Sequence, residues 1–305
     1  MTSVSVRVPA KINLCLGVGP VRADGFHPLA TVYQAVDLHD ELKASSVDSG
    51  EVTVHTVVEG DVDRPGDPVP DGTDNLAVRA ALLLREHAGV DDGVELVVRK
   101  VIPVAGGMAG GSADAAAALV ACNELWGLGL SRLELEPLAA ELGSDVPFLL
   151  HGGNAVGSGR GETVSPVLAR GSYEWVVAIA DGGLSTAAVF AEHDRLTQGQ
   201  DRATPVVPDA LLAALRSGDA HALGRALSND LTGAALSLRP ELQETLDVGR
   251  QAEALGSLLS GSGPTCLFLA SDEQHSMDIA IALAGAGVCS DVVQASGPVP
   301  GVRFV

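Results

Sequence analysis

The segment VIPVAGGMAGGSADAAAAL, residues 101–119, joins a glycine-rich stretch to an alanine-rich run of high helix propensity. The glycines of this segment are Gly106, Gly107, Gly110 and Gly111. Glycine permits positive φ angles and lets another group approach the main chain closely, so this stretch is expected to form a loop. An apolar strand is expected over residues 94–101, and Pro103 ends it. The pattern therefore predicts a strand, a glycine loop and a helix that begins near Ser112.

This loop does not match the familiar phosphate-binding and nucleophile motifs. A Walker loop would have a lysine where this chain has Ser112. The dinucleotide fingerprint would have a glycine in place of Met108, and the nucleophile elbow would have a glycine in place of Asp114. Unpaired backbone N–H groups at a helix N-terminus nevertheless favour an anion. From the residues alone, the loop is either an anion site, which we favour, or a tight turn that packs a helix on a sheet.

The composition limits the classes of partner. The 305 residues allow one large or two medium domains, and the formal net charge of −20 disfavours nucleic acids and anionic membranes. Only 19 lysines and arginines are present, so a phosphate ligand needs a locally positive site, which draws attention to Lys11, Arg22, Arg99 and Lys100. No window reaches the roughly 18–20 apolar residues of a membrane span, and no signal peptide is recognisable. We expect a cytoplasmic protein whose four dispersed cysteines are reduced thiols.

The hydrophobic patterning predicts a mixture of strands and helices. Strands are expected at residues 4–8, 12–18, 51–58, 94–101, 175–181, 264–270 and 288–295. Helices are expected at residues 75–87, 113–126, 131–142, 185–195, 209–217, 220–227, 240–255 and 273–286. Asp74 is the expected cap of the first helix, and residues 64–74 form a surface connection. The pattern restarts near residue 165, which indicates an α+β protein in two halves.

Three segments, in this order, resemble the GHMP kinase family, named for galactokinase, homoserine kinase, mevalonate kinase and phosphomevalonate kinase. They are PAKINLCLGV at residues 9–18, PVAGGMAGGSADAAAAL at 103–119 and LSGSGPTCLF at 259–268. The resemblance implies a two-domain α+β fold, with an N-terminal ATP-binding domain at residues 1–165 and a C-terminal domain at 166–305. It also implies an active site in the cleft between the domains, and ATP and Mg²⁺ as cofactors.

Within the family, three further segments indicate the substrate. They are KINLCLGVGPVRADGFHPL at residues 11–29, DNLAVRAA at 74–81 and GSDVPFLLHGGNAVGSGRGE at 143–162. They resemble the members that phosphorylate the 2-hydroxyl of a cytidine diphosphate sugar alcohol, diphosphocytidyl methylerythritol, in isoprenoid precursor synthesis. The sequence departs from the family pattern at three places. Met108-Ala109 stands where Leu-Gly is more frequent, Asp114 stands where Asn is common, and Phe26 stands where Tyr is frequent. A carboxylate at Asp114 would repel phosphates unless it points away or meets a metal.

The resemblance assigns catalysis to Lys11 and Asp145. Asp145 stands at a helix start, with Pro147 tolerated in the first turn, and from this pattern alone it could be only a helix cap. Lys11, which alone could be a solvated edge residue, shares a strand face with Asn13. We expect Lys11 to pair with Asp145, to keep this carboxylate ionised and to offset charge on the transferred group.

The remaining expected contacts follow from the same resemblance. For ATP these are Asn75, Lys100, Pro103, Gly106, Gly107, Met108, Ala109, Gly110, Gly111, Ser112 and Ala113. For the substrate they are Asn13, Asp145, the aromatic or polar base contacts Phe26, His27 and Phe190, and the groups Ser185, Thr186, Gly261 and Ser262. No dedicated metal-ligating residues are assigned.

Two other functions stay open. Another GHMP kinase, of the homoserine or mevalonate type, would not need the base contacts at Phe26, His27 and Phe190. A non-catalytic sensor on the same fold would be expected to lack Lys11 or Asp145, and both are present.

Overall fold

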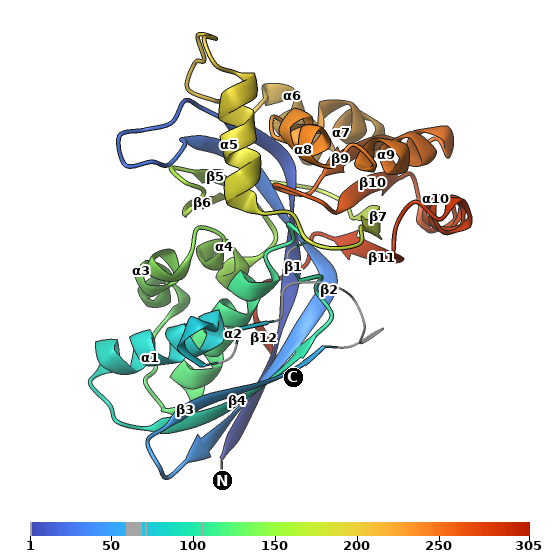
Figure 1. The fold of residues 1–305 in the computed structure, drawn as a ribbon. Helices are drawn as coiled ribbons and strands as arrows, with labels where there is room; N and C mark the ends of the chain where they lie inside the picture. The colour runs from blue at the N-terminus through green and yellow to red at the C-terminus, as the bar shows by residue number, and fades with distance from the viewer. Residues whose placement is uncertain (1, 59–68, 71, 105) are drawn as a thin grey trace.

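The structure is a computed structural model that describes residues 2–58, 69–70, 72–104 and 106–305. It is an α+β fold built on two sheets (Figure 1). Within the described residues the first sheet runs β12-β1-β2-β4-β3, with β5 and β6 joined to β2, and β8 to β1. Its strands are β1 Ser3–Val18, β2 Leu29–Val47, β3 Val52–Val58, β4 Gly93–Lys100, β5 Asn154–Ser158, β6 Thr163–Pro166, β8 Ser228–Asn229 and β12 Arg303–Phe304.

One strand prediction for this sheet was wrong, and β2, β5, β6, β8 and β12 were not predicted. The two expected strands around Pro9 are one strand, β1, and its pairing with β2 shifts register between Pro9 and Ala10. Proline cannot donate to a ladder, and here it lies at a bulge rather than at a strand end. Strand β2 was not predicted, because its first half is buried on both faces and shows no alternation.

Helices α1 to α4 lie on one side of the first sheet (Figure 1). They are α1 Leu76–Ala88, α2 Gly110–Leu125, α3 Arg132–Leu142 and α4 Val146–His151, and η1 Gly72–Asp74 precedes α1. The alanine run of α2 is almost wholly buried, because small side chains let this helix lie close to α1, α4 and the sheet. The expected strand, glycine loop and helix are present, but the helix begins at Gly110 rather than near Ser112. Asn75, not Asp74, caps α1, and its Oδ1 accepts from Ala77 N at 2.9 Å.

The second sheet has the order β11-β7-β10-β9, and the remaining helices belong to the same half of the chain, with α7, α9 and α10 in contact with this sheet. Its strands are β7 Tyr173–Ile179, β9 Gly256–Leu259, β10 Cys266–Ala270 and β11 Asp291–Gly297. The helices are α5 Thr186–Leu196, α6 Asp209–Ser217, α7 Ala220–Ala226, α8 Thr232–Leu238, α9 Leu242–Gln251 and α10 Glu273–Ala286. The predictions for α6 and α10 have the observed bounds, while α8 and β9 were not predicted.

The two halves are tied together. Strands β8 and β12, from the C-terminal half, pair with β1, and Trp175 of β7 donates Nε1–H to Gln34 Oε1 of β2 at 2.8 Å. The predicted limit at residue 165 lies within β6, and the domain ranges 1–165 and 166–305 stay a prediction. The cysteines are free thiols. None of the helices in the described part of the chain has the length and apolarity that a membrane crossing needs. Much of the expected connection at residues 64–74 lies outside the described residues.

Candidate active site

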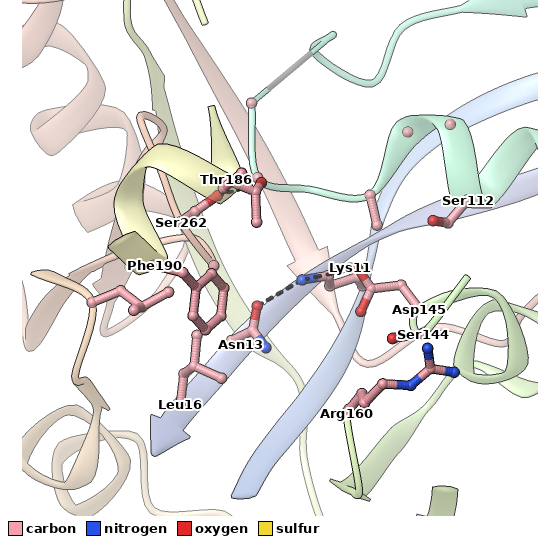
Figure 2. Close-up of a pocket in the computed structure, with 18 of the residues that line it drawn as sticks. Lys11, Asn13, Leu16, Ser112, Ser144, Asp145, Arg160, Thr186, Phe190 and Ser262 are labelled. Atoms are coloured by element: carbon pink, nitrogen blue, oxygen red, sulfur yellow. Dashed lines mark hydrogen bonds and ion pairs between the residues drawn. The ribbon is translucent and has the colours of Figure 1, made fainter. Parts of the chain in front are cut away.

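A pocket with a volume of about 970 Å³ brings together segments that are far apart in the sequence (Figure 2). It is lined by β1, the connection after β1, the glycine loop, the start of α4, helix α5 and the turn between β9 and β10. Of the predicted site residues it includes Lys11, Asn13, Phe26, His27, Lys100, Pro103, Gly106, Gly107, Ala109, Gly110, Gly111, Ser112, Asp145, Thr186, Phe190, Gly261 and Ser262. Four predicted residues are outside the lining: Asn75, Met108, Ala113 and Ser185.

Each of these four residues has a structural role. Asn75 and Ser185 cap α1 and α5, and Ala113 is buried within α2. Met108 is fully buried, and its carbonyl accepts the backbone N–H of Lys11 at 3.2 Å. None of the four borders the pocket, and their ligand contacts stay predictions.

The two glycine segments of the sequence pack against each other. Gly107 has φ +74°, and a Cβ there would lie only 2.1 Å from the carbonyl oxygen of Ser260. The Ser260 hydroxyl donates to Gly107 O at 3.0 Å, and Gly261, at φ +55°, lies over the same carbonyl. The turn between β9 and β10 thus packs against the glycine loop, and the N-terminus of α2 faces the pocket.

Lys11 and Asp145 are paired, as expected. The Nζ atom of Lys11 lies 3.6 Å from Asp145 Oδ2, and the lysine side chain is 6% exposed against 28% for the aspartate. Asp145 stands at the N-cap of α4, but its carboxylate accepts no capping hydrogen bond. Because the side chain is not used to cap the helix, the alternative of a purely structural aspartate is not supported.

A chain of hydrogen bonds fixes the lysine. Lys11 Nζ donates to Asn13 Oδ1 at 2.7 Å, Asn13 Nδ2 donates to Thr31 Oγ1 at 2.8 Å, and Thr31 donates to Cys15 O at 2.6 Å. The ring of Tyr33 lies under Lys11, with 5.5 Å between Nζ and the ring centroid. Burial and the charge of Asp145 raise the pKa of Tyr33 well above its usual value, so this phenol stays neutral. Sequence patterns did not indicate Tyr33, because it lies in the unpredicted β2.

The other end of the pocket is built around His27. Its Nε2 atom lies 3.0 Å from Asp194 Oδ1 on α5, and its ring lies 5.0 Å from that of Phe190, centroid to centroid. Since a carboxylate only accepts, this contact places a proton on Nε2 and leaves Nδ1 as the other polar atom of the ring. Arg202 donates to Asp194 at 3.0 Å and holds the carboxylate in turn.

Phe26 and two hydroxyl groups complete this end. Phe26 is 49% exposed, and its ring faces the guanidinium of Arg160, whose Cζ lies 4.8 Å from the ring centroid. Thr186 Oγ1 and Ser262 Oγ are 2.9 Å apart (Figure 2). Asp194, Arg160 and Arg202 were missed at the sequence level, because nothing local distinguishes them from solvated charges.

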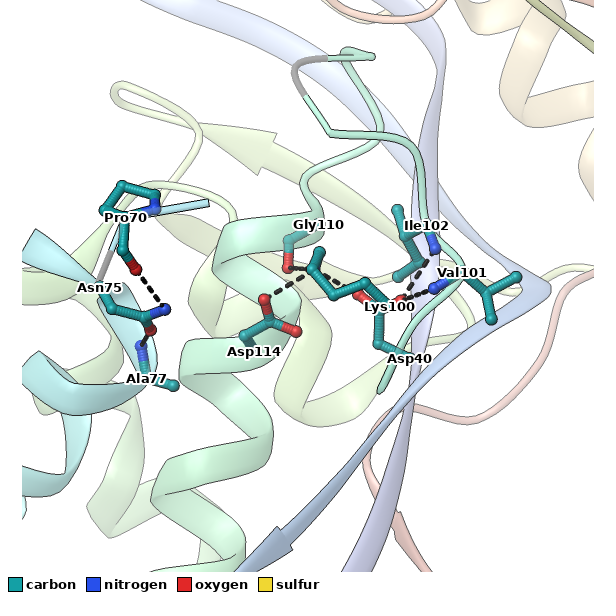
Figure 3. Close-up of polar contacts among 9 residues, drawn as sticks. All are labelled: Asp40, Pro70, Asn75, Ala77, Lys100, Val101, Ile102, Gly110 and Asp114. Atoms are coloured by element: carbon teal, nitrogen blue, oxygen red, sulfur yellow. Dashed lines mark hydrogen bonds and ion pairs between the residues drawn. The ribbon is translucent and has the colours of Figure 1, made fainter. Parts of the chain in front are cut away.

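The role of Asp114 becomes clear in the structure: it binds a lysine (Figure 3). Lys100 Nζ lies 2.6 Å from Asp114 Oδ2, 2.6 Å from Asp40 Oδ2 and 3.3 Å from Gly110 O. The other oxygen of Asp40 accepts from the backbone N–H groups of Val101 and Ile102. The ammonium of Lys100 therefore has its three donors engaged, and it fastens the first turn of α2 to β2 and β4. Its predicted contact with the nucleotide stays a prediction.

The cluster of Lys100, Asp40 and Asp114 is deeply buried. Burial raises the pKa of Asp114 from its usual 3.8 to about 7, although Lys100 opposes the shift. The Oδ1 atom of Asp114 is buried with no hydrogen-bond partner among the described residues. The carboxylates of Asp40 and Asp114 thus share one ammonium, that of Lys100.

Two models of one family match the chain in both halves. Residues 75–153 match the GHMP kinases N terminal domain, and residues 211–287 match the GHMP kinases C terminal domain. With the relatives described next, these matches show that the chain belongs to the GHMP kinase family, a class of ATP-dependent small-molecule kinases.

Several of the similar proteins carry the name of one enzyme. The chain is 56% identical to the 4-diphosphocytidyl-2-C-methyl-D-erythritol kinase of Thermobifida fusca, over 100% of this chain and 99% of that protein. Its identity to the enzyme of the same name from Nocardia farcinica is 54%, over 99% and 96%. A crystal structure of 4-(cytidine 5'-diphospho)-2C-methyl-D-erythritol kinase superimposes with a TM-score of 0.74 at 33% identity, over 96% and 98% of the two chains.

A more distant structure shares the fold. The homoserine kinase of Cytophaga hutchinsonii superimposes with a TM-score of 0.72 at 20% identity, over 100% of this chain and 98% of that one. The predicted two-domain GHMP kinase fold is thereby confirmed. The fold alone does not separate the substrates within the family.

Proposed function

We propose that this protein transfers the γ-phosphoryl group of ATP to the 2-hydroxyl of 4-diphosphocytidyl-2-C-methyl-D-erythritol, in the methylerythritol phosphate pathway to isoprenoid precursors. The observation that carries the proposal is the position of the Lys11–Asp145 pair between the glycine loop and the His27–Phe190 pair in one pocket. The relatives that are more than half identical over nearly the whole chain carry the name of this kinase.

Asp145 and Lys11 perform the proton transfer and charge neutralisation. The Asp145 carboxylate takes the proton of the acceptor hydroxyl while its oxygen attacks the γ-phosphorus and the bond from phosphorus to the leaving ADP oxygen breaks. Lys11 lies beside Asp145 and offsets the charge that accumulates on the transferred group. Asn13 and Thr31 hold the ammonium in place, so little reorganisation is needed during the reaction.

The glycine loop receives the phosphates of ATP. Its backbone N–H groups and the N-terminus of α2 supply positive partial charge without a Walker lysine. Magnesium, which the family's use of ATP implies, would be held by few protein groups: no three metal-ligating side chains gather among the described residues. The oxygens of Ser112 and Asp145 face the pocket and suit a hard cation that keeps several waters and the nucleotide phosphates as ligands, and bound there it would neutralise phosphate charge.

The cytosine base is held at the other end. The face of Phe190 lies against His27, and the exposed face of Phe26 can stack on a base. Because Nε2 of His27 is committed to Asp194, its Nδ1 atom and the backbone around it are left for the base edge. This arrangement favours the cytidine substrate over homoserine or mevalonate, which have no aromatic base to place there. A non-catalytic sensor is not favoured, because both Lys11 and Asp145 are in position.

Purified protein with ATP and Mg²⁺ is expected to form ADP and a phosphorylated product with diphosphocytidyl methylerythritol, and little product with homoserine or mevalonate. Product formation is followed by coupled ADP release and by mass spectrometry. Turnover of homoserine without turnover of the cytidine compound would overturn the substrate assignment. The cytoplasmic location inferred from the sequence stays a prediction.

A further inference from the structure

Arg160 lies in the wall of the pocket, between the base end and the phosphoryl-transfer end. It belongs to the turn between β5 and β6, and its Cζ is 4.8 Å from the centroid of the Phe26 ring. The next residue, Gly161, is packed close to Ser144: a Cβ on Gly161 would lie 3.8 Å from Ser144 Cβ. Figure 2 shows the Arg160 side chain extending from this turn toward Ser144 and Asp145. Arg160 therefore spans the distance between the two ends of the site.

The guanidinium of Arg160 keeps donors for a ligand. Its closest acidic partner is Glu162, with 3.7 Å between Nε and Oε1, and its side chain makes no hydrogen bond to any described residue. It is 34% exposed, and the pocket is the space that it borders. The two lysines of the described pocket lining differ: Lys11 is bound to Asn13 and Asp145, and Lys100 has its three donors engaged. In the described lining, Arg160 is thus the lysine or arginine best able to bind an incoming anion.

We propose that Arg160 binds the diphosphate of the cytidine diphosphate substrate and so determines the preference for a nucleoside diphosphate. The inference rests on the proposed function. With the base at His27 and the acceptor hydroxyl at Asp145, the diphosphate that joins them has to pass Arg160. In a protein of net charge −20, a cationic side chain at this place favours the binding of such a group. A guanidinium suits this task, since its planar fork donates two parallel hydrogen bonds to phosphate oxygens.

The neighbours of Arg160 hold this side chain for that role. Phe26 offers the guanidinium an aromatic face, and Glu162 accepts from the backbone N–H of Arg160, which fixes the turn. Lysine at this position would keep the charge but lose the fork and much of the stacking. The charge and the geometry of Arg160 can therefore be tested separately with two substitutions.

Steady-state kinetics of the full chain test the proposal. For Arg160→Met we expect the KM for diphosphocytidyl methylerythritol to rise about 10- to 100-fold, the usual worth of a charge-assisted hydrogen bond, with kcat and the KM for ATP little changed. Arg160→Lys should be intermediate. Arg170→Met is the matched control, because Arg170 is exposed and lies outside the pocket lining. A rise in the KM for ATP instead would place Arg160 on the nucleotide side and overturn the proposal.

Inhibition by cytidine, CMP and CDP identifies the group that Arg160 binds. The original protein should prefer CDP to cytidine as a competitive inhibitor, and Arg160→Met should lose most of this preference while cytidine itself binds unchanged. An equal loss for all three inhibitors would show that Arg160 acts only through Phe26 and would overturn the proposal. Failure of the original protein to phosphorylate the cytidine substrate would instead contradict the proposed function, so the two failures are distinguishable.

Discussion

The ammonium of Lys11 lies 3.6 Å from Asp145 Oδ2 but only 2.7 Å from Asn13 Oδ1, so the lysine is fixed by a neutral amide rather than by the carboxylate. The side chain of Asp145 does not cap α4, so its carboxylate oxygens can accept hydrogen bonds from groups in the pocket. A carboxylate that lies close to a cation but is not hydrogen-bonded to it can still accept a proton.

Replacing Asp145 removes the proton acceptor while the shape of the side chain is retained. For Asp145→Asn we expect kcat to fall by about 10²- to 10⁴-fold, the usual contribution of a positioned base, with the KM for ATP little changed. Initial rates of ADP release measure the effect. Asp247→Asn, at an exposed position on α9, is the control and should keep the original rate. Near-normal turnover of Asp145→Asn would contradict the assignment of this residue as the base.

Lys11 is expected to act as one unit with Asp145. Lys11→Met should lower kcat as well, and the double variant should be little worse than the more damaged single variant, because groups that share one task give non-additive losses. Single-turnover rates of the two single variants and the double variant measure this coupling. Fully additive losses would indicate two independent roles.

Asp194 is expected to orient His27 for the base. Asp194→Asn removes the charge that holds Nε2, and the KM for the cytidine substrate should rise about tenfold, with kcat and the KM for ATP retained. Glu192→Gln is a control on the same helix, since Glu192 pairs with Arg195 and Ser237 away from the pocket lining. If Asp194→Asn left the KM for the cytidine substrate unchanged, the position of His27 would not depend on this carboxylate.

Local patterns predicted what depends on local structure. The strand, glycine loop and helix over residues 93–125, and the bounds of α6 and α10, follow from propensity, glycine placement and helical period. Strand β2 was missed because burial on both faces removes the alternation that marks a strand. It carries Tyr33, Gln34 and Asp40, so each contact of these residues was missed with it.

The contacts that complete the site depend on tertiary structure. Asp114 was recognised as unusual, but its partner Lys100 is shared with Asp40, whose position depends on the pairing of β2 with β4. Asp194 is one of several polar residues on α5, and only the packing of this helix brings it to His27. The catalytic pair was predicted because the family resemblance supplied it, since residues 11 and 145 carry no local signal of their proximity.

The contact between the glycine loop and the β9–β10 turn makes a sharp prediction about stability. At Gly107 a methyl group would meet Ser260 O at 2.1 Å and would also require a left-handed backbone. Gly107→Ala should lower the free energy of unfolding by about 2–4 kcal/mol, the sum of overpacking and backbone strain. Urea denaturation measures it. Gly111→Ala is the control: its Cβ would be 3.4 Å from Leu76 Cδ1, inside a helix, so the stability should be kept or slightly raised. Equal effects of the two substitutions would show that the contact with Ser260 is unimportant.

The buried carboxylate of Asp114 should make stability depend on pH. Because its pKa is raised to about 7 in the folded protein, the folded state binds this proton more tightly than the unfolded chain does. The stabilisation that comes from this tighter proton binding by Asp114 is therefore fully present below pH 3.8, the usual pKa of an aspartate. It is lost as the pH rises through about 7.

Asp114→Asn removes this titration and keeps an oxygen for Lys100 to bind, while Asp40 remains as the counterion. The Tm of the variant relative to the original protein should increase steadily between about pH 4 and 7, the interval over which Asp114 would ionise. Thermal denaturation followed by circular dichroism at several pH values measures this difference. Asp40→Asn is the contrasting variant: it replaces one of the two oxygens that accept from Lys100, Val101 and Ile102 by a donor, and should destabilise the protein by about 3–5 kcal/mol. A constant Tm difference between the Asp114 variant and the original protein across this range would mean that Asp114 is already ionised at the lowest pH, and that Lys100 outweighs its burial.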